Sequence, residues 1–266
     1  MSHQPLRDAE NRLDTAMGKA FLSERVVLRG QDLHHDLADL DWFGLHLFAI
    51  TGRRFSPESC EMLGYLWACT SYPDPSIWPN NTAALAGSVR TTAGLAMAAG
   101  LVSSEAGLFG VKPLVKVVDF FRRARDARAA GLSLEDIVET EIAEAGLVYG
   151  YGRPLASLDE RAPHVIRKAT ELGFADGECF RMALEIHEYL GRTRRIGMNI
   201  AALDGALGAD FGFTPEEFHL YMILIVYAGQ PPCFQGAVAR PEGTFFPVRC
   251  ASVVYDGPGT RRWGVD

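Results

Sequence analysis

The sequence has no long uninterrupted hydrophobic run. Its most weakly polar stretch, residues 81–102, carries Arg90 among many alanines and glycines, which is typical of a buried helix with close neighbours. The first 20 residues mix charges throughout and lack the apolar segment of a secretory signal. We therefore expect no membrane-spanning helix and a cytoplasmic location.

Cysteine and basic charge are also scarce. The five cysteines are odd in number, widely spread and never in a CxxC pair, so neither a disulfide framework nor a zinc site is predicted. The net charge of −7 comes from 33 acidic and 26 basic side chains. This balance argues against nucleic acid or an anionic membrane as the main partner.

Several common catalytic motifs are missing as well. The sequence contains no GxSxG, HExxH or P-loop motif, and no Rossmann glycine pattern attached to a strand. The seven histidines lie mostly in helix patterns, where a structural role is expected. We predict no metal site and no tightly bound cofactor. What is present is a 48% hydrophobic chain of 266 residues, long enough to bury a substantial core.

Helix signals dominate, so the sequence predicts an all-α fold. Two helices have complete start signals: Ser56-Pro57-Glu58, and Thr214 with Glu217 in capping-box spacing. Strand character is limited to 23–29 and 248–255, and glycine-rich loops at 107–110, 146–152 and 205–212 are candidate hinges. Further helices are predicted at about 32–51, 81–100, 113–130, 133–144, 162–172 and 176–190.

The loop at 149–161 is the most informative polar segment. A tight glycine turn leads to Arg153, and a second turn presents Asp159, Glu160 and Arg161 just before a predicted helix. Such a loop can offer hydrogen-bond donors to an anion. The competing interpretation is that Arg161 only caps or pairs locally.

Five segments carry the most specific pattern: RGQDLHHDLADLDWFGLHLFAITGRRFS, CTSYPDPSIWPNNT, GLVYGYGRPLASLDERA, MNIAALDGALGADFGFTPEEF and FFPVRCASVVYDGPGTRRW. Each alone is weak, but their order and separations together resemble the citrate synthase superfamily. The likeness is greatest to its short members, citryl-CoA lyase and the citrate-synthase-like module of ATP-citrate lyase. It covers nearly the whole chain.

The resemblance implies a citrate-synthase-like homodimer. Residues 1–110 and 216–266 would form a large helical domain, and residues 111–215 an inserted small helical domain, with the site in the cleft between them. The C-terminal segment through Trp263 would be exchanged between subunits, so that Arg261 or Arg262 reaches the other subunit's site. Closure about the glycine loops would exclude water from the reacting enolate.

Three site residues follow from matching motifs. Asp204 in the LDG triplet falls on the catalytic aspartate of the lyase-type members, which removes a proton from the acyl-CoA methyl group; aligning the longer synthases instead places Ala201 there. Arg161 falls on the arginine of the family's "DPR" motif. Arg249 falls on the carboxylate-binding arginine near the C-terminus, and both arginines suit two-point capture of a carboxylate.

The catalytic histidines of the family are replaced. Asn80 stands at the histidine of "SAHNT" and Arg153 at that of "GxGHxV", and both side chains can donate hydrogen bonds to a developing oxyanion. Glu105 lies at or beside the third position and is a candidate general acid. Tyr72 replaces another histidine and is assigned to substrate binding.

We therefore predict a carbon–carbon lyase or acyltransferase that makes or breaks a bond in a carboxylated 3-hydroxy acid or its thioester. A coenzyme A thioester is the candidate co-substrate. However, Ala156, Ser157 and Leu158 stand where the family has a lysine and an arginine for the CoA phosphates. Two alternatives follow: a CoA-independent reaction on a di- or tricarboxylate, and a non-catalytic ligand-binding homologue.

Overall fold

The computed structural model describes residues 4–108, 110–153, 159–245 and 248–259 of the chain. Helices dominate these ranges, which confirms the all-α prediction. The helices are α1 (Gln4–Asp8), α2 (Trp42–Thr51), α3 (Pro57–Thr70), α4 (Trp78–Ser88), α5 (Ala93–Ser104), α6 (Val111–Ala129), α7 (Leu134–Ala145), α8 (Ala162–Glu171), α9 (Glu178–Arg194), α10 (Ile200–Asp210), α11 (Pro215–Ala228) and α12 (Gln230–Val238).

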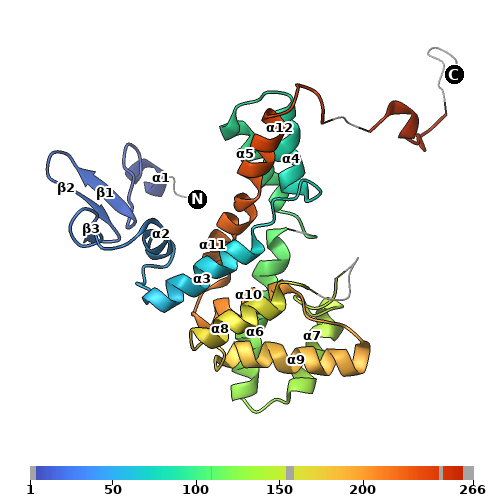
Figure 1. Cartoon of the computed structure of the whole chain (residues 1–266). Coiled ribbons are helices and arrows are strands. Elements are labelled where there is room, and N and C mark those ends of the chain that lie inside the picture. The colour runs from blue at the N-terminus through green and yellow to red at the C-terminus, as the bar shows by residue number, and fades with distance from the viewer. Residues whose placement is uncertain (1–3, 109, 154–158, 246–247, 260–266) are drawn as a thin grey trace.

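The helices gather into two groups (Figure 1). At one end α12 packs on α4 and α4 on α5; at the other, α10 packs on α6 and α9, with α7 and α8 around them. Helices α3 and α11 pack on each other and connect the groups, since α11 also contacts α5 and α6, and α3 contacts α8. The predicted division into 1–110 with 216–266 and an inserted 111–215 stays a prediction.

A small antiparallel sheet lies beside α2 (Figure 1). Its strands follow in the order β1 (Gly18–Phe21), β2 (Arg25–Leu28) and β3 (Gln31–Asp32), with Gly18 opposite Leu28 and Val27 opposite Asp32. The strand predicted at 23–29 is therefore confirmed as β2.

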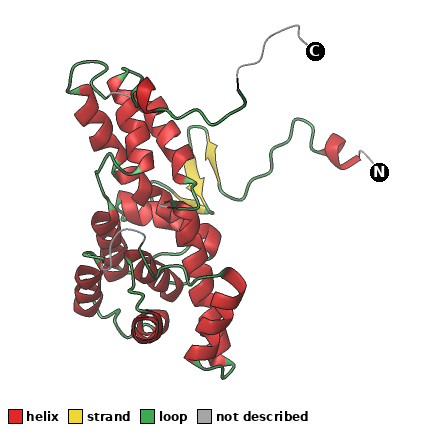
Figure 2. Ribbon diagram, turned by 90° about the vertical axis from the view of Figure 1, so that its right-hand side faces the viewer, coloured by secondary structure: helices red, strands yellow, loops and turns green. Residues whose placement is uncertain are grey.

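The strand predicted at 248–255 is wrong. Cys250–Ser252 form a single 3₁₀ turn, and the segment 248–259 extends away from the helices in both views (Figure 1, Figure 2). The β-branched Val253 and Val254 are exposed there. A strand needs a partner for its backbone groups, and the described part of this segment pairs with none.

The core is centred on α10, which is buried on every side. A Cβ at Gly205 would lie 2.4 Å from Val117 Cγ1 of α6, and one at Gly208 would lie 2.5 Å from the Phe218 ring of α11. The prediction of a loop at 205–212 is therefore wrong for residues 205–210, which belong to α10. These glycines allow neighbouring helices to approach closely, and only Gly212, with φ of 76°, has turn geometry.

The two predicted helix starts are confirmed. The Ser56 hydroxyl accepts the N–H of Ser59, and Pro57 opens α3. Thr214 and Glu217 form the reciprocal capping box of α11. Local side-chain chemistry was sufficient to place these ends.

Two predicted helix ranges need correction. The range 81–100 contains two helices, because Arg90 adopts a left-handed φ of 60° and its guanidinium donates to the carbonyls of Val238 and Arg240. The range 32–51 is helical only from Trp42, since the Asp32 carboxylate holds a turn and Asp41 caps α2 through the Gly44 N–H. Across the described residues, no helix has the length and apolarity to cross a membrane.

Candidate active site

Asp204 lies in the middle of α10 and is completely buried. Neither of its carboxyl oxygens has a hydrogen-bond partner among the described residues. Burial raises the pKa of Asp204 to about 8; the charge of Arg161 opposes this shift and that of Asp159 adds to it. At neutral pH the carboxyl group is therefore mostly protonated, so it can donate a proton.

Arg161 stands at the start of α8 and pairs with Asp159. Its Nε donates to Asp159 Oδ1 and its Nη2 to Oδ2, each at 2.8 Å. Burial alone would raise the pKa of Asp159, but these bonds, the Ile200 N–H and the arginine charge hold it below its ordinary value. Only the Nε–Nη2 edge of the guanidinium is used in this pair, and the Nη1–Nη2 edge is the one suited to a second carboxylate.

Tyr72 follows the C-terminus of α3 and meets Arg161. The guanidinium carbon lies 5.9 Å from the centre of the tyrosine ring, which is a cation–π contact. Tyr72 is 44% exposed, whereas the Asp159 carboxylate beneath the arginine is buried. Tyr72, Arg161 and Asp204 thus run from the surface towards the core.

Asn80 on α4 is buried and holds the Tyr72 loop. Its Nδ2 donates to the carbonyl oxygens of Tyr72 and of Asp74, the latter at 3.1 Å. Both amide hydrogens are used in these bonds. Asn80 therefore positions Tyr72 in this conformation, and its predicted role as an oxyanion donor stays a prediction.

Arg153 follows the predicted glycine turn, in which Gly150 and Gly152 have positive φ values of 91° and 87°. Its Nη1 donates to Glu160 Oε2 at 3.0 Å. Asn199 fixes the turn to the start of α10 by donating to the Gly152 carbonyl at 2.8 Å. Arg153 is therefore placed near α10 with a paired charge.

Two predicted site residues lie elsewhere. Glu105 ends α5, and its Oε1 lies 2.7 Å from His219 Nε2 on α11. Arg249 is exposed on the extended C-terminal segment. Within the described chain no interaction joins either residue to Asp204, so their roles stay predictions. Ala156, Ser157 and Leu158 lie outside the described residues.

Sequence reasoning missed two residues around Asp204. Asp159 was visible in the loop but not assigned to the site. Tyr221 is fully buried on α11, and its hydroxyl donates to the Leu63 carbonyl at 2.8 Å. Burial and the charge of Asp204 raise the pKa of Tyr221. A tyrosine within the apolar run of 218–228 was the available signal.

The far end of α8 also contacts α3. Lys168 pairs with Glu61, and its ammonium group lies 5.9 Å from the centre of the Tyr65 ring. Helix α8 is thus tied to α3 at Tyr72 and again at Glu61.

Over the described ranges no group of three metal-ligating side chains is present. The chemistry available at the site is proton transfer and carboxylate binding.

Comparison with known proteins identifies the fold. No protein-family model and no curated protein sequence matches the chain. Among solved structures, citryl-CoA lyase from Hydrogenobacter thermophilus superposes with a TM-score of 0.81 at 18% identity, covering 94% of this chain and 96% of that one.

Two longer proteins share the fold. ATP citrate lyase from Methanosaeta concilii, determined in complex with citryl-CoA, gives a TM-score of 0.72 at 16% identity over 97% of this chain but 44% of its own. Citrate synthase from Thermotoga maritima gives 0.65 at 18% identity, covering 85% of this chain and 60% of its own. The predicted citrate-synthase-like fold is confirmed.

Proposed function

We propose that this chain is a citrate-synthase-like enzyme that makes or breaks a carbon–carbon bond in a carboxylated 3-hydroxy acid or its coenzyme A thioester. The observation that carries the proposal is Asp204, a buried carboxyl group beside Arg161 that has no hydrogen-bond partner among the residues the structure describes. Buried polar groups are normally satisfied, so an unpaired carboxyl group in a core helix with a strongly raised pKa is a candidate reactive group. The fold shared with citryl-CoA lyase supports the reaction class.

In the ligand-free protein Asp204 is mostly protonated, which is the form that the cleavage direction requires. Water accepts the proton of the 3-hydroxyl group as the adjacent carbon–carbon bond breaks; the 3-carbon becomes a ketone, and the electron pair of the bond forms the enolate of the thioester. Asp204 then gives its proton to the enolate carbon, which becomes a methyl group. In the condensation direction the ionised Asp204 removes that proton, and with a pKa of about 8 only about a tenth is ionised at pH 7.

Arg161 supplies the substrate-binding charge in this proposal. Asp159 fixes one edge of the guanidinium, so the Nη1–Nη2 edge can receive a substrate carboxylate in a defined direction. The Tyr72 ring covers the guanidinium, and Asn80 holds the tyrosine loop in place.

Turnover of citryl-CoA tests the proposal. Purified protein should release acetyl-CoA from citryl-CoA, or free CoA from acetyl-CoA and oxaloacetate. Asp204→Asn should lower kcat by at least about a hundredfold, because a proton-transfer group contributes roughly that much. Asp39→Asn, at an exposed carboxylate, should leave the rate unchanged. An Asp204→Asn enzyme with the parental rate would contradict the assignment.

A CoA-independent reaction on a di- or tricarboxylate is the second candidate. It is favoured by the absence of basic residues at 156–158 and by the pairing of Arg153 with Glu160. Citrate should then raise the melting temperature of the parent but not of Arg161→Ala, and CoA should have no effect. Stabilisation by CoA alone would favour the first candidate, and no stabilisation by any of these ligands would point to a non-catalytic homologue.

We also propose that the protein is a homodimer. Apolar side chains are exposed along α4 and α5, among them Leu85, Val89, Leu95 and Val102. A second subunit that covered these side chains would bury them, and the segment that carries Arg249 extends away from the helices (Figure 1), which supports its exchange between subunits. Sedimentation should give a dimer that Leu95→Glu with Val102→Glu dissociates; a parental monomer would contradict the proposal.

A further inference from the structure

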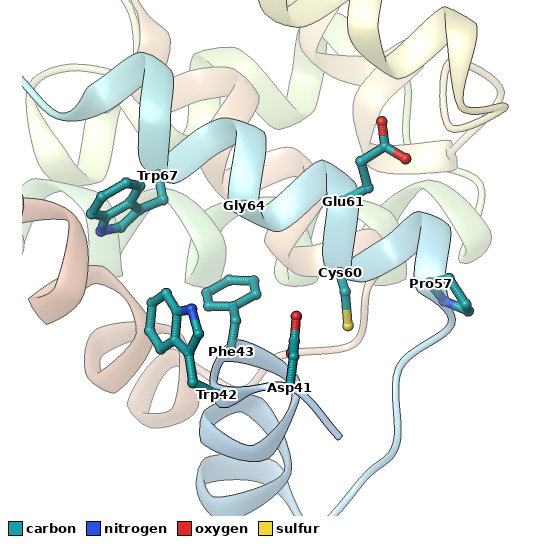
Figure 3. Close-up of a pocket in the computed structure, with 8 residues that line it drawn as sticks. All are labelled: Asp41, Trp42, Phe43, Pro57, Cys60, Glu61, Gly64 and Trp67. Atoms are coloured by element: carbon teal, nitrogen blue, oxygen red, sulfur yellow. The ribbon is translucent and has the colours of Figure 1, made fainter. Parts of the chain in front are cut away.

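A pocket lies between the start of α2 and the part of α3 from Pro57 to Trp67, with a volume of about 410 Å³ (Figure 3). None of its lining residues belongs to the group around Asp204. Gly64 forms part of its floor, and a Cβ there would meet no atom within 4 Å. The pocket is therefore open space over α3, formed by residues that the proposed reaction does not use.

Aromatic rings form one side of this pocket. Trp42 is 66% exposed and stands edge-on to Phe43, with ring centres 5.4 Å apart. Trp67 faces the same space and is fixed by its Nε1, which donates to the Leu224 carbonyl at 3.0 Å. Two tryptophan rings therefore border the pocket, one anchored and one exposed.

The charged side chains that line the pocket are both acidic. Glu61 points away from the tryptophan rings and pairs with Lys168 (Figure 3). The Asp41 carboxylate points into the space between Phe43 and Cys60, and one of its oxygens accepts the Gly44 N–H at 2.6 Å. Burial raises the pKa of the Cys60 thiol, and the charge of Asp41 raises it further. Asp41 thus places a negative charge at the pocket, beside the ring of Phe43.

We propose that this pocket binds a small organic cation, an ammonium group with apolar substituents, against the faces of Trp42 and Trp67 with Asp41 as counter-ion. The negative face of an indole ring attracts a cation, and tryptophan is the best side chain for this contact. A nearby carboxylate adds Coulomb attraction, and with no basic residue among the lining side chains an anion is disfavoured. Apolar substituents suit a pocket whose walls are largely hydrocarbon.

Choline is a suitable probe, because 3,3-dimethyl-1-butanol has the same shape without the charge. Titration of the full-length protein, followed by tryptophan fluorescence, should show saturable binding of choline and at least about tenfold weaker binding of the alcohol. Two of the four tryptophans border the pocket, so the signal should be large.

Three variants assign the site. Trp42→Ala should weaken choline binding about tenfold, while Trp67 still reports it. Asp41→Asn should weaken it as well, and it removes only the charge because asparagine caps a helix as well as aspartate does. Trp78→Ala, at an exposed tryptophan on α4, is the matched control and should bind choline like the parent.

Several results would overturn the proposal. These are the absence of saturable choline binding, equal affinity for the neutral alcohol, or parental affinity in both Trp42→Ala and Asp41→Asn. Circular dichroism should show that each variant is folded like the parent, because Trp42 and Asp41 lie outside the buried core. None of these outcomes depends on turnover at Asp204.

Discussion

Asp159 holds Arg161 by two side-chain hydrogen bonds of 2.8 Å, and the same carboxylate accepts the N–H of Ile200, also at 2.8 Å. Ile200 is the first residue of α10, the helix that carries Asp204. One buried carboxylate therefore fixes both the proposed substrate-binding arginine and the start of the helix bearing the proposed acid. This shared carboxylate explains how a loop residue and the start of a helix 41 residues later can contribute to one candidate site.

Removing Asp159 should be strongly destabilising. In Asp159→Ala, Arg161 would keep its charge in a largely buried position without a partner, which typically costs about 3–5 kcal/mol of unfolding free energy. Urea denaturation measures this loss. The double variant Asp159→Ala with Arg161→Ala should lose less than Asp159→Ala alone; an additive loss would show that the two side chains act independently.

Asp204 should make stability fall as the pH rises. In the unfolded chain its carboxyl group loses its proton near pH 4, whereas in the folded protein it keeps it up to a pH of about 8. Between these values the folded state binds more protons, so its contribution is full below pH 4 and decreases towards pH 8.

Asp204→Asn does not titrate, so it should gain stability over the parent as the pH rises through this window, by the order of a few kcal/mol. Urea midpoints of both proteins between pH 4 and pH 9 measure the effect. Parallel stability curves for the two proteins would show that the carboxyl group titrates normally.

Two glycine substitutions should have opposite signs. Gly205→Ala places a methyl group against Val117, and such overpacking typically destabilises by about 1–3 kcal/mol. Gly191→Ala lies at an exposed position of α9, where the added carbon meets nothing within 4 Å, and should stabilise by up to about 1 kcal/mol. Thermal melting compares them; equal effects would mean that α10 can move away from α6.

The contribution of the Lys168–Glu61 pair to stability should depend on the opposite charges and not on which residue carries which charge. Each single reversal, Lys168→Glu or Glu61→Lys, places like charges between α8 and α3 and should lower the melting temperature slightly. The double reversal should restore it at low salt. If the double variant is no better than the singles, the pair does not hold α8 on α3.

The sequence predicted best those features that are decided locally. Ser56 and Thr214 begin helices because their hydroxyls bond backbone N–H groups three residues later, and that chemistry is visible in the sequence. The break at Arg90 was not visible, because a left-handed arginine is stabilised by distant carbonyls of α12 and the residues after it. Gly205 likewise resembled a loop residue until its neighbour Val117 was known.

The candidate site likewise contains local contacts that the sequence can predict and long-range contacts that it cannot. The motif containing Asp159 and Arg161 lies within one turn, so its pairing could be expected as the local interpretation of the sequence. The proximity of Tyr72 to Arg161 follows only from the packing of α3 against α8. Glu105 was placed by motif position alone, and its actual neighbour is His219.

The complete burial of Asp204 has a kinetic consequence. Solvent does not reach its carboxyl group, so no substrate can reach it in this conformation either. Contact between Asp204 and a substrate therefore requires the segments packed around this residue to separate first. If that step is slow, substrate association will be far below the diffusion limit and will saturate at the rate of opening.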